Sequence, residues 1–200
     1  QVLDPAAFGG KEAFLRLMDS LTERCHANAP IDPQNVRMYV CGPTVYDRAH
    51  IGNARPVIVF DVLFRLLRHL YGEAHVKYVR NITDVDDKII NAANGEGVTW
   101  DTISNRYIAS YFEVMDKLHI RRADKYPRVS EHMDEIIHMV QTLIDKGYAY
   151  PVDIGDVYYR TLKFQGYGKL SHQPIEDLQS GARIAVGEVK ENPLDFALWK

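Results

Sequence analysis

The chain has 200 residues, of which 46% are hydrophobic and 26% are charged, and this composition is typical of an ordinary globular protein. The formal net charge of −3 excludes a strong overall basic field, so RNA binding would need a local basic patch or another part of the protein. The longest apolar run, from Val57 to Phe64, is interrupted by Asp61 and is too short to span a bilayer.

The first predicted elements form a β-α-β unit. Residues 36–41 are β-branched, apolar or aromatic and precede a Gly-Pro pair, which predicts a buried strand. A helix is expected over residues 56–71, with a proline in its first turn and Gly72 as its stop. A second strand over residues 75–81 should then be parallel to the first and reached by a right-handed crossover. The expected buried stripe of the helix consists of Ile58, Val62, Leu66 and Leu70, widened by Phe60, Leu63 and Leu67.

Further helices and a hairpin are expected in the rest of the chain. Acidic residues open a predicted helix over residues 84–93, and an apolar stripe predicts another over residues 99–120. Ser130 should cap a helix that runs to residue 146. Residues 148–161 read as a hairpin whose tyrosine pairs pack on one another, because no lysine or arginine alternates with them as in a base-stacking surface. Residues 162–200 read as irregular.

The two cysteines give no disulfide framework and no CxxC pair. Cys25 lies in a segment expected to be irregular and is interpreted as structural or incidental. Cys41 ends the first strand, a common place for a small buried apolar residue when it is considered alone. The chain begins at Gln1 without a leader and stops at Lys200 without a polar tail, so we expect a cytoplasmic protein of which this is a fragment.

The segment that joins the first strand to the helix, Cys41–Arg55, reads CGPTVYDRAHIGNAR and concentrates chemically active side chains. In open α/β sheets, ligands bind where a strand passes into a helix. The unpaired N–H groups and the dipole of the helix start favour a phosphate there. Considered alone, His50 would be interpreted as a helix cap or a surface residue. Because it follows a strand end and opens a helix, we instead expect His50 and Asn53 to donate hydrogen bonds to the charge that develops on an α-phosphate.

This segment resembles the nucleotide-binding signature of class I aminoacyl-tRNA synthetases, in the form found in the cysteinyl-tRNA synthetase family. A second block, Tyr78–Ile90, reads YVRNITDVDDKII and resembles the same family. Shorter similar stretches bring the likeness to residues from about 15 to 200, and they lie at Tyr167–Ser171, Gly181–Arg183 and Asn192–Lys200.

The resemblance implies an α/β fold in which a Rossmann-type parallel-sheet nucleotide-binding domain is interrupted by an α+β connective insertion. The first half of the catalytic domain would occupy residues 1–97. The insertion would then occupy residues 98–190, and residues 191–200 would return to the catalytic domain.

The resemblance also implies metal and nucleotide ligands. Cys41 would be the first of four ligands of one Zn²⁺ ion, and the remaining Cys, His and Glu would lie beyond residue 200, as would the mobile Lys-Met-Ser-Lys-Ser loop. An open zinc position would select a thiolate substrate by ligand softness. His50, Gly52 and Asn53 would bind ATP, which acts with Mg²⁺ as a substrate, and Gly52 would leave room for the adenine. Asn53 stands where the family often has a second histidine.

The cysteine substrate would be contacted by Gly42, Thr44 and Thr83, with Thr44 also within reach of the nucleotide. Three carboxylates lie within the four residues that follow Thr83. They could suggest Mg²⁺, but acids are commoner at the start of a helix, where they interact favourably with its dipole.

The implied reaction joins L-cysteine and ATP as cysteinyl-adenylate and transfers the cysteinyl group to the 3′ end of tRNA(Cys). We expect a monomer without a membrane partner, and no activity from this fragment alone. The nearest alternative is the cysteine ligase of mycothiol biosynthesis, which shares the zinc cysteine and the His-x-Gly motif but departs from Asp-Asp-Lys-Ile-Ile and Gly-Asn-Ala-Arg, both intact here. Intact Cys41, His50 and Thr83 argue against a second alternative, a non-catalytic nucleotide- or RNA-binding paralogue.

Overall fold

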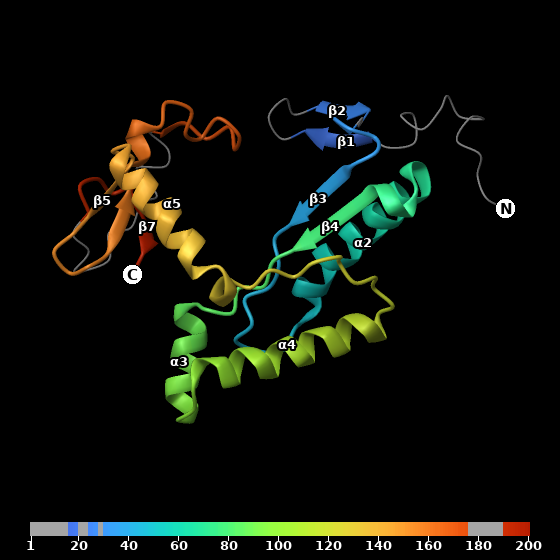
Figure 1. The fold of residues 1–200 in the computed structure, drawn as a ribbon, viewed down its shortest axis with the longest axis horizontal. Helices are drawn as coiled ribbons and strands as arrows, with labels where there is room; N and C mark the ends of the chain where they lie inside the picture. Colours follow the sequence, from blue (N-terminus) through green and yellow to red (C-terminus); the bar gives the residue numbers. More distant parts are fainter. Residues whose placement is uncertain (1–15, 20–23, 28–29, 176–189) are drawn as a thin grey trace. The chain divides into compact units, whose positions relative to one another are not determined.

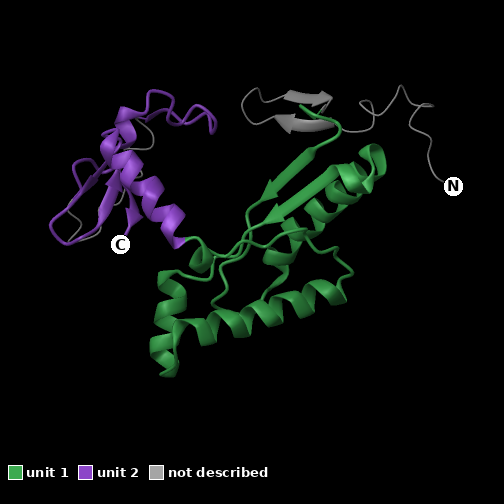
Figure 2. Cartoon of the chain, in the orientation of Figure 1, with its two compact units in different colours: residues 1–15, 28–132 green, residues 16–27, 133–200 purple. Residues whose placement is uncertain are grey.

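The structure is a computed structural model, and it describes residues 16–19, 24–27, 30–175 and 190–200 (Figure 1). The chain forms two compact units (Figure 2). The first contains residues 28–132, and the second contains residues 16–27 and 133–200. This compactness boundary follows His132, whereas the proposed start of an insertion at residue 98 concerns the family's domain organisation and stays a prediction.

The predicted β-α-β unit is confirmed in the first unit. Strands β3 (Val36–Val40) and β4 (Val76–Arg80) pair in parallel along all five residues of each. Helix α2 (Ile51–Tyr71) and the short 3-10 helix η2 (Glu73–His75) connect them. Gly72 ends α2 with a φ of +90°, a backbone conformation that favours glycine. The helix begins five residues before the expected position because His50 caps it there.

The apolar stripe predicted for α2 is wrong over its first half. Ile58 and Val62 are 42% and 61% exposed, although Leu70 at the end of the stripe is buried. The face that packs on the sheet instead runs through Val57 and Phe64. Apolar side chains cover more than one side of this helix, so their spacing alone could not identify the packed side.

The core of the first unit lies between α2 and the sheet. The rings of Phe64 on α2 and Tyr78 on β4 have centroids 5.0 Å apart, and both side chains are almost fully buried. Burial of an apolar side chain of this size contributes about 1.5–3 kcal/mol, so these contacts fix the helix to the sheet. A second cluster is formed where α3 (Asp87–Glu96) and α4 (Trp100–Lys117) meet the end of the sheet.

Two predicted helix starts are wrong, and the errors are linked. Helix α3 begins at Asp87 with Asp86 as its cap, so Asp84 precedes the helix and is buried. Helix α5 (Met133–Asp145) begins at Met133, and Ser130 lies in the 3-10 helix η3 (Val129–Glu131). The Ser130 hydroxyl donates to the Asp84 carboxylate instead of capping a helix.

The second unit contains two antiparallel sheets and α5. Strands β1 (Arg16–Asp19) and β2 (Arg24–Ala27) form one sheet. Strands β5 (Ala149–Pro151), β6 (Val157–Tyr159) and β7 (Phe196–Trp199) form the other, in that order. The predicted hairpin is therefore confirmed as β5–β6, whereas the two stretches expected to be irregular each contain a strand, β2 around Cys25 and β7 near the end. The similar stretch at 181–183 lies outside the described residues.

Tyrosines pack within the hairpin as expected. The ring centroids of Tyr150 and Tyr158 lie 6.0 Å apart, and those of Tyr148 and Tyr159 lie 6.4 Å apart. Sequence reasoning missed the polar centre beneath them, where the Tyr150 hydroxyl donates to buried Asp195 at 2.8 Å.

None of the helices in the described ranges combines the length and the apolarity that crossing a membrane requires.

Candidate functional site

His50 and Asn53 together cap the start of α2. Nδ1 of His50 accepts a hydrogen bond from the main-chain N–H of Gly52 at 3.0 Å. In return, Oδ1 of Asn53 accepts from the main-chain N–H of His50 at 3.0 Å, which completes a capping box. Because Nδ1 is an acceptor here, a neutral imidazole carries its proton on Nε2. No hydrogen bond within the described ranges uses that Nε2–H or the Asn53 amide N–H₂, so both are donors available to a ligand.

Gly52 is required by the cap itself. A β-carbon at this position would lie 2.8 Å from Cε1 of the His50 ring. Any other residue would therefore push the imidazole away from the helix start. The first turn of α2 contains no acidic residue, so the positive end of its dipole is not neutralised locally. This helix start favours an anion.

The loops that follow β3 and β4 are paired to each other. The main-chain N–H of Val45 donates to the oxygen of Thr83 at 3.2 Å, and the N–H of Thr83 donates to the oxygen of Pro43 at 3.0 Å. These bonds place Thr44 and Thr83 opposite each other in a parallel bridge. The structure thus brings together two of the three residues predicted to contact cysteine, and the third, Gly42, lies two residues before Thr44 and bonds to Asn81, two residues before Thr83.

Asn81 holds the loops together, and sequence reasoning missed it. Its Oδ1 accepts from the main-chain N–H of Gly42 at 2.8 Å. The backbones are so close that a β-carbon at Gly42 would lie 1.5 Å from the main-chain oxygen of Asn81. Asn81 stands at a strand end in the second block that resembles the family, where a short amide side chain can bond to a neighbouring backbone. This position in the sequence was the signal that could have identified Asn81.

Cys41 is exposed at the end of β3, which does not suit the alternative of a buried structural cysteine. Its Sγ donates a weak hydrogen bond to the oxygen of Gly42 at 3.7 Å. The described part of the chain contains no group of three or more His, Cys, Asp or Glu residues placed to hold a metal ion. Cys41 can therefore supply one ligand of a zinc site, and the chain as described does not complete the set of four that tetrahedral zinc requires.

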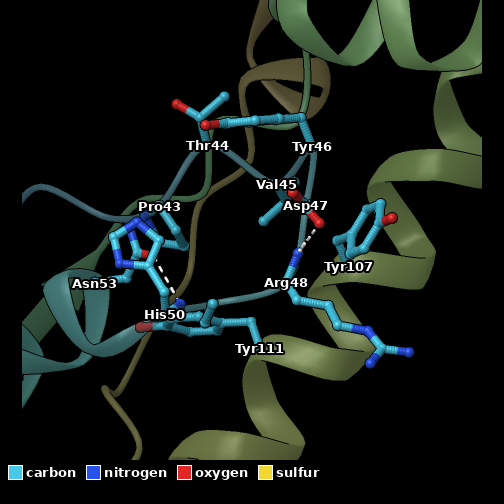
Figure 3. A pocket seen from close by; sticks show the side chains of 11 residues that line it. Pro43, Thr44, Val45, Tyr46, Asp47, Arg48, His50, Asn53, Tyr107 and Tyr111 are labelled. Atoms are coloured by element: carbon cyan, nitrogen blue, oxygen red, sulfur yellow. Dashed lines mark hydrogen bonds between the residues drawn. The ribbon is translucent and has the colours of Figure 1, made fainter.

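A cavity of about 70 Å³ lies where the loop before α2 faces α4 (Figure 3). It brings Thr44, His50 and Asn53 to one space, whereas Cys41 and Thr83 are not part of its lining. Two tyrosines of α4 that sequence reasoning assigned only to a helical stripe form the opposite wall. The lining consists of Pro43, Thr44, Val45, Tyr46, Asp47, Arg48, Ala49, His50, Asn53, Tyr107 and Tyr111.

A buried cation lies beneath these loops. Arg80 is 2% exposed, its Nε donates to the Tyr78 hydroxyl at 2.7 Å, and its Nη2 has no hydrogen-bond partner among the described residues. Its Cγ would lie 3.3 Å from a β-carbon at Gly42, so the aliphatic part of the side chain lies against the paired loops, and its guanidinium lies over the Tyr78 ring. Burial raises the pKa of Tyr111, and the positive charge of Arg80 opposes that shift. The Arg80 charge and the α2 dipole both favour an anionic ligand.

The sequence of the chain matches a family of known proteins over most of its length. The family profile described as "tRNA synthetases class I (C) catalytic domain" matches residues 27–200. The chain belongs to this family. It is 57% identical over 186 residues to a cysteine–tRNA ligase of a Geobacillus strain, and 56% and 54% identical to those of Bacillus licheniformis and Caldicellulosiruptor saccharolyticus. Each match covers 93% of the chain and 39% of the relative, so the chain spans about two fifths of these proteins.

Solved structures share the fold at lower identity. The methionyl-tRNA synthetase of Mycobacterium tuberculosis, in complex with methionyl-adenylate, matches with a TM-score of 0.57 and 14% identity, over 82% of this chain and 44% of that one. LeuRS of Agrobacterium radiobacter K84, in a ternary complex with tRNA and LeuAMS, matches with a TM-score of 0.50 and 20% identity, over 68% and 18%. The fold is therefore the Rossmann-like α/β fold of class I synthetase catalytic domains.

Proposed function

We propose that this chain is part of a cysteine–tRNA ligase and supplies one half of its catalytic site. The observation that carries the proposal is the pairing of Thr44 with Thr83. This pairing joins the loop that begins at Cys41 and Gly42 to the loop after β4. The capping box of His50 and Asn53 follows on the same segment as Thr44. The sequence identity of 57% to a cysteine–tRNA ligase supports cysteine as the amino-acid substrate.

On the nucleotide side, the start of α2 would hold the phosphates of ATP, which is used with Mg²⁺. A carboxylate oxygen of cysteine attacks the α-phosphorus, and the bond to the departing pyrophosphate breaks. The Nε2–H of His50 and the amide of Asn53 are fixed before the ligand arrives, so they can meet the charge that develops on the α-phosphate without reorganisation. Positioning and charge stabilisation are the main contributions expected of these residues.

The cavity in this chain is one wall of the site that we propose. Its volume of about 70 Å³ is well below the roughly 300–1,000 Å³ of ligand pockets. The remainder of the site would come from the other three fifths of the protein, as would the ligands that complete a zinc site with Cys41. When bound, zinc would select the substrate thiol; Gly42, Thr44 and Thr83 would orient the rest of the cysteine.

We further propose tRNA(Cys) as the acceptor of the cysteinyl group and a monomer as the working form. The domain boundaries at residues 97/98 and 190/191 belong to the same proposal. They describe how the family's catalytic domain is interrupted, and limited proteolysis of the complete protein would test them.

The test is cysteine-dependent ATP–pyrophosphate exchange and tRNA charging by the complete protein, with serine as the control amino acid. We expect exchange and charging with cysteine only, lost in Cys41→Ser and absent from this chain alone. Exchange without charging of tRNA would favour the amine ligase instead. A complete protein with neither step, although folded, would show that the catalytic proposal is wrong and favour a binding paralogue.

A further inference from the structure

The carboxylate of Asp84 is buried next to the cysteine side of the proposed site, which consists of Gly42, Thr44 and Thr83. Among the residues that the structure describes, its hydrogen-bond donors belong to Ser130. Asp84 directly follows Thr83 and is 1% exposed. Its Oδ1 accepts from the main-chain N–H of Ser130 at 3.0 Å, and its Oδ2 accepts from the Ser130 hydroxyl at 2.5 Å. Burying a carboxylate is costly unless such donors satisfy it, and hydrogen bonds to a charged acceptor are the stronger kind. Ser130 therefore determines where Asp84 can lie.

Main-chain bonds bring the segment before Ser130 alongside the loop. The N–H of Ile82 donates to the oxygen of Pro127 at 2.9 Å, and the N–H of Val129 donates to the oxygen of Ile82 at 3.3 Å. The two bonds from Ser130 to Asp84 extend this side-by-side pairing from Ile82 to Asp84. Without the Ser130 hydroxyl, the Asp84 carboxylate would lose one of the two hydrogen bonds that it accepts from Ser130.

Thr83 is thus fixed from two sides. On one side it is bridged to Thr44 through main-chain bonds, and on the other its neighbour Asp84 is held by Ser130. The nucleotide residues do not depend on this arrangement, because His50 and Asn53 bond to each other. A change at Ser130 should consequently affect the cysteine side and leave the nucleotide side intact.

We infer that Ser130 is a positioning residue for the cysteine side of the site, acting through Asp84 on Thr83. The inference rests on the proposed function. Ser130 has no expected contact with a substrate; it keeps the loop that carries Thr83 in one conformation.

The experiment compares three variants of the complete protein by ATP–pyrophosphate exchange at varied cysteine and varied ATP. Ser130→Ala removes the hydroxyl, and Ser130→Thr keeps it. Ser104→Ala is the matched control, because it removes a buried hydroxyl whose one bond within the described ranges stays inside α4, to the oxygen of Asp101 at 3.2 Å. We expect Ser130→Ala to raise KM for cysteine about tenfold, as for a lost bond to a charged group, with KM for ATP within about twofold. Ser130→Thr should be close to wild type, and Ser104→Ala should change neither KM.

Equal increases in both KM values, or no increase, would overturn the inference, as would a folded Ser130→Thr protein with the defect of Ser130→Ala. Hydrogen exchange at the amides of residues 81–86 separates this inference from the proposed function. If the wild-type protein activates no cysteine, the proposed function fails. Faster hydrogen exchange at these amides in Ser130→Ala, and not in Ser104→Ala, would then still show that Ser130 holds the loop that carries Thr83, and unchanged hydrogen exchange would refute this.

Discussion

Gly42 and Asn81 lie in such close contact that a β-carbon at Gly42 would come within 1.5 Å of the main-chain oxygen of Asn81. The amide side chain of Asn81 also accepts the Gly42 N–H at 2.8 Å. The proposed cysteine side is therefore built on a backbone contact between the ends of two parallel strands. This relationship leaves the loop after β3 no freedom to move away from the loop after β4 without losing both contacts.

Gly42→Ala should destabilise the protein, because the atom that the new methyl group meets belongs to backbone and cannot rotate away. We expect a loss of at least about 1–3 kcal/mol in the free energy of unfolding, together with loss of cysteine activation. Gly95→Ala is the matched control, since a β-carbon there meets nothing within 4 Å and the residue lies inside α3. It should gain about 0.5–1 kcal/mol, and urea unfolding of both variants measures the difference. A Gly42→Ala protein as stable as wild type would contradict the contact.

Asn81 variants should separate its hydrogen bond from its shape. Asn81→Ala leaves the Gly42 N–H without its partner, which should cost about 1–3 kcal/mol of stability and raise KM for cysteine. Asn81→Asp keeps an acceptor oxygen of the same size in the same place and should retain most of both properties. Urea unfolding and pyrophosphate exchange at varied cysteine provide the measurements. Equal defects in the two variants would mean that the acceptor oxygen is not what holds Gly42.

Tyr150 should make the second unit sensitive to alkali. Burial raises the pKa of Tyr150 to about 12, from an ordinary value of 10. Between these two pH values the unfolded chain has released the phenol proton and the folded chain still holds it. The contribution of Tyr150 to the free energy of unfolding is therefore fully present below about pH 10. It is lost as the pH rises towards 12, at up to about 1.4 kcal/mol per pH unit for one proton.

Tyr150→Phe should therefore show a weaker loss of stability than wild type above pH 10. At neutral pH the variant should be less stable, because the hydroxyl donates to Asp195 at 2.8 Å and accepts the Glu191 N–H at 2.7 Å. Urea unfolding at several pH values measures both effects. Parallel curves for the two proteins across this range would exclude Tyr150 as the source of the alkaline sensitivity.

Local sequence signals were sufficient for the elements that carry the site. Apolar runs and glycine stops predicted β3, α2 and β4, and the strand-to-helix junction predicted the segment that contains His50. The errors arise where the outcome depends on distant residues. The partner of Gly42 lies 39 positions away, and that of Asp84 lies 46 positions away. No local pattern indicates that Ser130 bonds to Asp84 when its spacing suits a helix cap equally well.

His50 should combine two roles that substitution can separate. Asparagine is a good N-cap, so His50→Asn should keep the stability of α2, whereas His50→Ala should lose about 0.5–2 kcal/mol. Neither variant has the Nε2–H that would meet the α-phosphate, so both should lose pyrophosphate exchange, by about 10²–10³-fold if one preorganised donor is removed. Asp86→Ala is the control for cap loss, since Asp86 caps α3 by accepting from Lys88 at 2.9 Å; it should lose stability and keep exchange. A His50→Asn protein with wild-type exchange would reduce His50 to a helix cap, and the nucleotide contacts would then have to come from Asn53 and the helix start alone.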